Sequence, residues 1–144
     1  MKRDGDEISG RSFWEGCLAP DADAIAELAE AAIATIPEPL RSHLEGLVFR
    51  VEEFPADEIL DDLGIEDPFD LLGLYQGLGP SGRDSGIVAT GPDMVFLYRR
   101  PILDYWAAGE EPLDRLVRHV LIHEVGHHFG LSDADMARIE AGEP

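Results

Sequence analysis

Apolar residues recur along the chain in two rhythms, one helical and one extended. In residues 21–36 they return every three or four positions, which is the spacing of one face of an α-helix. Asp21 is a suitable N-cap for this helix, and Pro37 ends it. Two shorter helices are expected at 40–44 and 57–63, each followed closely by a glycine.

Three segments rich in β-branched and aromatic residues are predicted to be strands. They are LVFRVEEF at 47–54, LLGLYQG at 71–77 and MVFLYRR at 94–100. Gly73, inside the second segment, indicates a bulge or a close approach of another part of the chain. The glycine-rich stretch that follows, 77–92, is predicted to be a mobile loop.

The longest helix is predicted from Pro112 until Gly130 stops it. A helix with apolar residues on two opposite faces is packed on both sides, and we expect this one to lie between the sheet and the 21–36 helix. The apolar residues are Leu113, Leu116, Val117 and Val120 on one face and Ile122, Val125 and Phe129 on the other. Gly126 costs about 1 kcal/mol relative to alanine within a helix, which indicates that another backbone passes close by.

The chain has the length of one domain with its own hydrophobic core. Residues 1–20 are polar and aperiodic, and they are predicted to form a flexible arm before a single domain over 21–144. The first ten residues lack the apolar run of a secretory signal, and no stretch approaches the ~18 apolar residues of a membrane helix. We therefore expect a cytoplasmic protein.

The formal net charge of −19 is unusual for 144 residues. A chain this acidic is repelled by phosphate backbones and by anionic lipid surfaces. We therefore expect neither nucleic acid nor a membrane as a partner. Solubility is the main expected consequence of the charge, and a preference for basic partners is a further hypothesis.

His123, Glu124 and His127 form an HExxH motif within the longest predicted helix. Two histidines four positions apart project from one side of a helix, so both imidazoles can reach one metal ion at ~2.0–2.1 Å. Glu124 points to a neighbouring angle, where a general base can reach water on the metal. The motif predicts a zinc ion held by the two histidines.

A third protein ligand is needed, because two histidines alone hold zinc poorly. Gly130 can adopt a positive φ and turn the chain so that Asp133 returns to the metal. Three protein ligands and a water define an open, catalytic zinc site, in which the pKa of the water falls to about 7. Alternatively, Ser132 or Asp133 caps a final helix over 134–141. Asp135 and Glu140 are then the fallback ligands.

Other polar and aromatic residues near the motif receive lesser roles. His119 lies one turn before the motif and is expected to be a partly buried structural histidine, with a supporting contact to a metal ligand as the alternative. His128 is expected to point away from the ligand pair. Tyr75, Tyr98 and Arg99 are expected to pack and to be solvated on or beside the strands, although each could reach a reacting oxyanion.

The segment HEVGHHFGLSD follows the pattern HExxHxxGxx(H/D), in the variant that ends in Asp. With LLGLYQG and FLYRRPILD upstream, the chain resembles the small bacterial zincin-like metallopeptidase family. The resemblance implies an α+β minimal zincin fold, in which a small sheet and a backing helix flank the active-site helix. It also implies that His123, His127 and Asp133 bind Zn²⁺ and that Glu124 is the general base and proton shuttle.

The leading prediction of function is a zinc-dependent metallopeptidase-like hydrolase, in which metal-activated water attacks a peptide carbonyl with Glu124 as general base. Its substrate would be a peptide or protein that pairs with an edge strand, either 71–77 or 94–100. One alternative is a non-catalytic binding module stabilised by zinc. The other is a metal-dependent endoribonuclease, against which both Glu124 and the negative charge argue.

Overall fold

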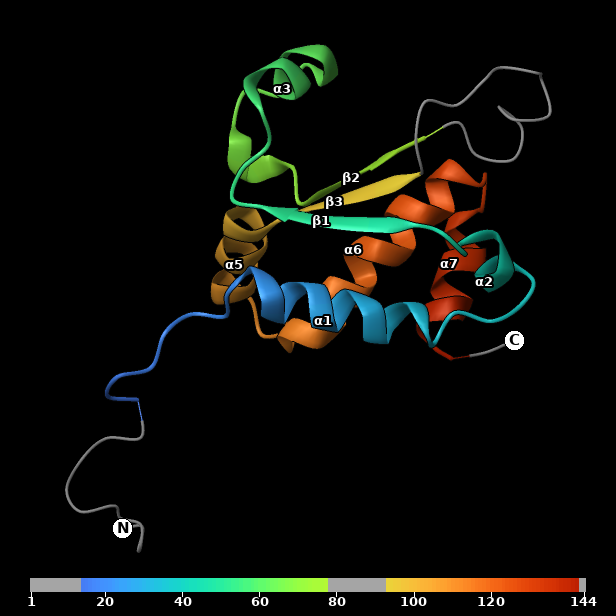
Figure 1. Ribbon diagram of the computed structural model, residues 1–144, viewed down its shortest axis with the longest axis horizontal. Helices are drawn as coiled ribbons and strands as arrows, with labels where there is room; N and C mark the ends of the chain where they lie inside the picture. Colours follow the sequence, from blue (N-terminus) through green and yellow to red (C-terminus); the bar gives the residue numbers. More distant parts are fainter. Residues whose placement is uncertain (1–13, 78–92, 143–144) are drawn as a thin grey trace, which may run out of the picture.

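The computed structural model describes residues 14–77 and 93–142 (Figure 1). Its elements, in chain order, are α1 (Ala22–Ile33), α2 (Leu40–His43), β1 (Val48–Glu52), α3 (Asp57–Leu63), the 3-10 turn η2 (Pro68–Asp70), β2 (Gly73–Gln76), β3 (Met94–Tyr98), α5 (Arg99–Ala108), α6 (Leu113–His128) and α7 (Asp133–Glu140). The fold is α+β, with a small sheet and helices packed against it, as the sequence predicted.

The described strands form one sheet in the order β1-β3-β2. β1 runs parallel to β3, whereas β2 runs antiparallel to it. Val95 and Leu97 of β3 are fully buried, as expected of a central strand. The prediction that 94–100 could be an edge strand is therefore wrong, because β3 is paired with β1 on one side and with β2 on the other. The 71–77 segment supplies β2, which lies at an edge of the described sheet.

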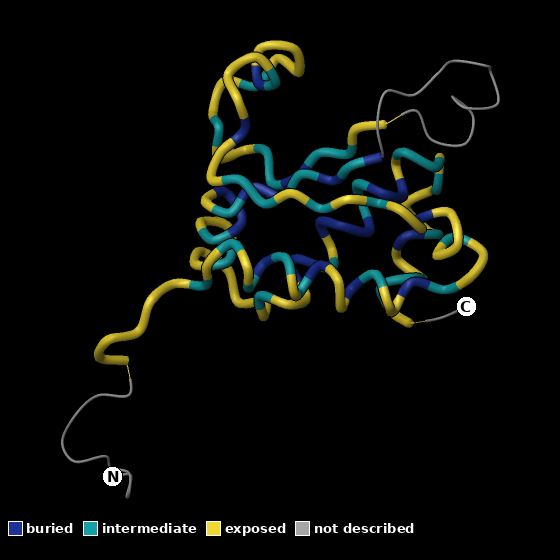
Figure 2. The backbone as a smooth tube through the Cα atoms, in the orientation of Figure 1, coloured by how far each residue is buried: buried dark blue, intermediate teal, exposed yellow. Residues whose placement is uncertain are grey.

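Helix α6 packs against both the sheet and α1, as its two apolar faces predicted, and α1 also packs directly on β1 (Figure 1). Buried segments gather along α6, β3 and the inner side of α1 (Figure 2). The buried side chains that form this core are Ile25, Ala29, Ala32, Ile36, Leu44, Val95, Leu97, Ile102, Leu116, Val117, Val120, Leu121, Ile122, Val125 and Met136. Burying each large apolar side chain contributes about 1.5–3 kcal/mol, so the core fixes where α6 lies.

Several helix ends follow the predicted signals. Asp21 accepts a hydrogen bond from the backbone N–H of Ala24 at 2.9 Å and so caps α1. The regular helix ends at Ile33, earlier than predicted, and turns continue to the proline that follows Ile36. Helix α3 has the predicted bounds, and Gly64 closes it in the left-handed conformation at φ 70°.

The chain reverses sharply after α6. Gly130 has φ 77°, and the N–H of Leu131 donates to the carbonyl of Gly126 at 2.8 Å. The N–H of Gly130 donates to the carbonyl of His127 at 3.2 Å, which completes a Schellman motif. Ser132 then caps α7, so only a few residues separate two helices that pack on each other.

The third strand is shorter than predicted, and the helix that follows it was not predicted. β3 ends at Tyr98, and α5 begins at the next residue, so Arg99 and Arg100 are helical rather than extended. Pro101 lies in the first turn of α5, where a backbone N–H has no partner within the helix. A proline so close to an apolar strand obscures this helix in the sequence.

The prediction that another backbone passes close to Gly126 is wrong. The space at this glycine is occupied by the side chain of Met136. A Cβ at this position would lie 2.4 Å from Sδ and 2.8 Å from Cγ of Met136. Met136 is fully buried and belongs to α7. The glycine therefore lets α7 pack closely on the C-terminal half of α6.

Two predicted segments lie mostly outside the described residues. The glycine-rich loop 77–92 is described only at Gly77, and the arm 1–20 only from residue 14. Within the described parts of the chain, no helix has both the length and the apolar character needed to cross a membrane.

Gly73 brings β2 into direct contact with α6, as one of its two predicted roles required. A Cβ there would lie 2.9 Å from Cγ1 of Val120 and 3.2 Å from the carbonyl oxygen of Phe96. Val120 is buried and β-branched, so its side chain cannot rotate away easily. The edge strand consequently packs directly on the helix that carries the HExxH motif.

Gly73→Ala is expected to destabilise the fold by about 1–3 kcal/mol, because the added methyl group overpacks the contact between β2 and α6. Urea unfolding followed by circular dichroism measures the change. The cost should shrink in a Val120→Ala background, which removes the clashing methyl groups. Gly109→Ala is the control, since its Cβ would meet only the Tyr105 carbonyl at 3.6 Å. Equal stabilities for Gly73→Ala and Gly109→Ala would contradict the close contact.

Candidate metal site on helix α6

Three histidines follow one side of α6 at intervals of four residues. The ring centroids of His119 and His123 are 4.1 Å apart, and those of His123 and His127 are 5.9 Å apart. Residues four apart on a helix are neighbours, so this spacing aligns the imidazoles without help from other elements. The His123 and His127 rings are nearly perpendicular, at 85°. His127 is exposed, whereas His123 is partly buried.

Glu140 of α7 binds the first two of these histidines. Its Oε1 lies 2.8 Å from Nδ1 of His119, and its Oε2 lies 2.8 Å from Nε2 of His123. The candidate ligand atoms of these three residues all lie within 4.8 Å of one another. One carboxylate thus joins two imidazoles across the packed pair of helices.

Arg118 fixes the end of α7 that carries Glu140. Its Nη1 donates to the carbonyl of Glu140 and its Nη2 to that of Ile139, both at 2.7 Å. The last carbonyls of a helix have no partner within it and attract a cation, so the guanidinium is well placed. Its Nε also donates to Oγ1 of Thr35, just beyond α1, at 3.0 Å. Arg118 therefore connects the ends of α1 and α7 to α6.

A cavity of about 710 Å³ opens beside the histidines. Its lining residues are Glu111, Arg115, Arg118, His119, His123, Asp133, Ala137, Glu140 and Ala141. Asp133 and Glu140 lie seven residues apart, which is close to two turns, so both face this cavity from α7. The cavity is lined by both acidic and basic side chains, and several of these are exposed to solvent.

The structure brings His123, Asp133 and Glu140 to one cavity, and it places His127 outside the lining. Ser132 caps α7 through a capping box with Asp135, so Asp133 is the first helical residue rather than the cap. The ligand roles of His123, His127 and Asp133 stay predictions. Of the two fallback ligands, only Glu140 lies against a histidine of the motif.

Glu124 lies on a different side of α6, against the edge strand. The Gly73 Cβ position is 3.5 Å from its Cγ, and the backbone N–H of Tyr75 hydrogen-bonds to its carboxylate. Burial raises the pKa of the Glu124 carboxyl above its usual value, while the Tyr75 hydrogen bond and the charge of His127 oppose the rise. A partly buried carboxyl with a raised pKa is a candidate for an acid–base role.

The aromatic residues around the motif pack against their neighbours, as expected from the sequence. Tyr75 stacks on His128 with ring centroids 3.8 Å apart, and its hydroxyl donates to Oδ2 of Asp93 at 3.1 Å. Tyr98 is almost fully buried, and burial raises its pKa to about 12, with smaller contributions from Glu52 and Glu124. Arg99 donates to the Pro20 carbonyl at 2.8 Å.

The donor atoms beside the cavity fit a zinc ion. Zinc takes imidazole nitrogens and carboxylate oxygens, and the cluster of His119, His123 and Glu140 offers both kinds within a small volume. His127 adds a further imidazole one turn away, and Asp133 a further carboxylate. The cluster is therefore compatible with a bound metal ion.

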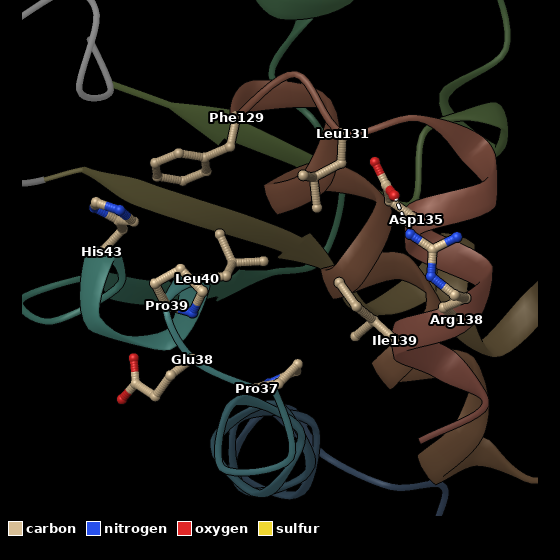
Figure 3. Close-up of a pocket in the computed structure, with 10 residues that line it drawn as sticks. All are labelled: Pro37, Glu38, Pro39, Leu40, His43, Phe129, Leu131, Asp135, Arg138 and Ile139. Atoms are coloured by element: carbon tan, nitrogen blue, oxygen red, sulfur yellow. Dashed lines mark hydrogen bonds and ion pairs between the residues drawn. The ribbon is translucent and has the colours of Figure 1, made fainter. Parts of the chain in front are cut away.

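A second cavity, of about 360 Å³, borders α7 at Asp135, Arg138 and Ile139, none of which lines the first cavity (Figure 3). Its walls are mainly apolar and come from the α1–α2 connection, α2, the end of α6 and α7. The lining residues are Pro37, Glu38, Pro39, Leu40, His43, Phe129, Leu131, Asp135, Arg138 and Ile139. Asp135 is paired with Arg138 there and is not among the lining residues of the cavity beside His123.

An α+β fold with an HExxH helix and a cluster of donors compatible with a metal ion is typical of metal-dependent hydrolases. The model of the zincin-like metallopeptidase family matches residues 44–143, which is more than half of the chain. The chain therefore belongs to the zincin-like metallopeptidase family. The matched range includes the sheet, α6 and α7, whereas α1 precedes it. No curated protein matches the chain.

The contact of Glu140 with His119 and His123 was not predicted from the sequence. The segment HVLIH places His119 and His123 at the same spacing as the two histidines of the motif. Glu140 lies on the same face of α7 as Asp133, two turns further along. These two spacings were readable in the sequence, but the angle between α6 and α7 was not.

Glu124→Gln is expected to stabilise the metal-free protein near neutral pH, because it removes a partly buried carboxylate and keeps an acceptor for Tyr75. The pKa of Glu124 is higher in the folded than in the unfolded protein. Its ionisation therefore lowers the stability of the fold at pH values above the folded pKa and has no effect below the unfolded pKa. The gain in Tm should therefore be present at about pH 7 and shrink towards about pH 4. Thermal unfolding in a chelator, with the exposed-site variant Glu66→Gln as control, tests this. A lower Tm for Glu124→Gln at neutral pH would contradict it.

Proposed function

We propose that the protein is a zinc-dependent metallopeptidase-like hydrolase that cleaves peptide bonds. The observation that carries the proposal is the position of Glu124, which follows His123 on α6 and is packed under the edge strand β2. A general base between a metal-binding stripe and a strand at the edge of the described sheet suits the hydrolysis of an extended peptide.

His123, His127 and Asp133 are the proposed zinc ligands, as the HExxHxxGxxD pattern implies. When bound, zinc polarises a carbonyl group and lowers the pKa of water to about 7. Ser132 supports this assignment, because it caps α7 in place of Asp133. Gly130 supports it too, because its positive φ reverses the chain three residues before Asp133 and returns it to α6.

Glu124 accepts a proton from the attacking water and passes it to the leaving amine. Burial against β2 raises the pKa of its carboxyl, which makes the carboxylate a stronger base than an exposed glutamate. The hydrogen bond from the Tyr75 N–H opposes this rise and favours the ionised carboxylate. The hydrogen bond from Tyr75 also fixes the orientation of the carboxylate.

The proposed substrate lies along β2 as an added strand. β2 pairs with β3 on one side, and its other side carries no strand among the described residues. An extended peptide would hydrogen-bond to the backbone groups of β2 that face away from β3, apart from the Tyr75 N–H, which already donates to Glu124, and its alternate side chains would point towards α6. The net charge of −19 favours basic peptides.

Cleavage of a complex peptide mixture by the zinc-loaded protein, read by mass spectrometry, tests the proposal. Wild-type protein is expected to generate new termini, and Glu124→Ala to slow their appearance by about 10²–10⁴-fold, because the general base is lost. Glu66→Ala is the matched control. It removes an exposed glutamate that lies just after α3, and it should cleave like wild type.

Equal cleavage by wild type and Glu124→Ala would reject the role of Glu124. No cleavage by any variant, with zinc bound, would reject the peptidase proposal and favour a binding module stabilised by zinc. The cut sites, where they appear, give the specificity, and an excess of basic residues near them would support the proposed charge preference.

A further inference from the structure

Helix α6 carries two overlapping pairs of histidines that share His123. The pair His119 and His123 and the pair His123 and His127 have the same spacing of four residues. The HExxH motif uses the second pair. The structure, however, places a carboxylate against the first pair, because Glu140 contacts both His119 and His123 at 2.8 Å.

We propose that His119, His123 and Glu140 form a second position for a divalent metal ion, which overlaps the site of the motif at His123. The two positions exclude each other, because Nε2 of His123 can bind one ion at a time. The inference rests on the proposed function only for the identity of the motif's site. The metal position itself stands on the geometry of these three side chains.

The distances between the donor atoms suit a metal ion with little rearrangement. Tetrahedral zinc with bonds of ~2.0–2.1 Å holds neighbouring ligand atoms about 3.3–3.4 Å apart. Each 2.8 Å contact between Glu140 and an imidazole must therefore lengthen by about 0.5 Å. Glu140 is partly buried, with 26% of its side chain exposed, so it has room for this shift. All donor atoms already lie within 4.8 Å of one another.

The hydrogen bonds of Glu140 show which nitrogens face the proposed ion. A carboxylate only accepts hydrogen bonds, so Nδ1 of His119 and Nε2 of His123 must each carry a proton when they bind it. A metal ion would replace both protons and attract the same carboxylate. Arg118 holds Glu140 through its backbone carbonyl rather than its side chain, so the carboxylate stays available for either partner.

An ion in this position is separated from the general base. Glu124 lies against β2 and is not part of the lining of the cavity beside His119 and His123. The two side chains of His119 and Glu124 differ by about 140° around the helix. The second position therefore holds a metal ion without engaging Glu124, and it competes with the catalytic site for His123.

Zinc titration of the chelator-treated, full-length protein tests the inference, with binding measured by calorimetry and by competition with a chromophoric chelator. His127→Ala removes a ligand of the motif's site and leaves the second position intact. It is expected to bind one zinc ion with an affinity within about tenfold of wild type. Adding Glu140→Gln to His127→Ala should weaken zinc binding by more than about 100-fold.

Two further variants separate ligation from structural support. Glu45→Gln in the His127→Ala background removes an exposed carboxylate elsewhere and should leave zinc binding unchanged. Glu140→His in the same background replaces an oxygen ligand by a nitrogen ligand. It should therefore bind zinc more tightly than Glu140→Gln in that background. With cobalt(II) in place of zinc, the visible absorption band of this variant should be shifted relative to that of His127→Ala with Glu140 intact. Circular dichroism of each metal-free variant establishes that it is folded.

Loss of zinc binding in folded His127→Ala would overturn the inference, as would unchanged binding after Glu140→Gln is added. Failure of Glu140→His to restore binding would also count against Glu140 as a ligand. These results are distinct from failure of the proposed function. Zinc binding that survives in His127→Ala, without peptide cleavage by wild type, would keep the second position and remove the peptidase.

Discussion

The burial of α6 on two sides is the constraint on which the rest of the structure depends. The sheet covers one face and α1 covers the other, so the polar residues of this helix are confined to what remains of its surface. His119, His123 and His127 share one such stripe, while Glu124 lies against β2. Gly73 allows this arrangement, because any side chain at that position would push the strand away from the helix.

The second requirement is that α7 returns tightly to α6. The Schellman motif at Gly130 and the capping box at Ser132 define the turn, and Gly126 gives Met136 a place to pack. Arg118 holds the far end of α7 by its last carbonyls. Together these contacts carry Asp133 and Glu140 to the side of His123, so that backbone geometry and core packing determine which carboxylates a metal ion could meet.

Much of this arrangement could be predicted from local sequence patterns. The two apolar faces of α6 predicted its position, Gly130 predicted the reversal, and Gly73 predicted a close approach. Features that depend on the meeting of distant elements could not be predicted in the same way. The helix after Tyr98 was hidden by Pro101, and the contact of Glu140 with His123 depends on how α7 crosses α6, which no local pattern encodes.

Both proposed metal positions on α6 share His123 as a ligand. Anomalous diffraction at the zinc absorption edge, from crystals of the zinc-loaded protein, tests it most directly. We expect one strong peak at about 2.0–2.1 Å from Nε2 of His123, with the remaining ligands drawn either from His127 and Asp133 or from His119 and Glu140. A fully occupied zinc ion that is not bonded to His123 would contradict the claim.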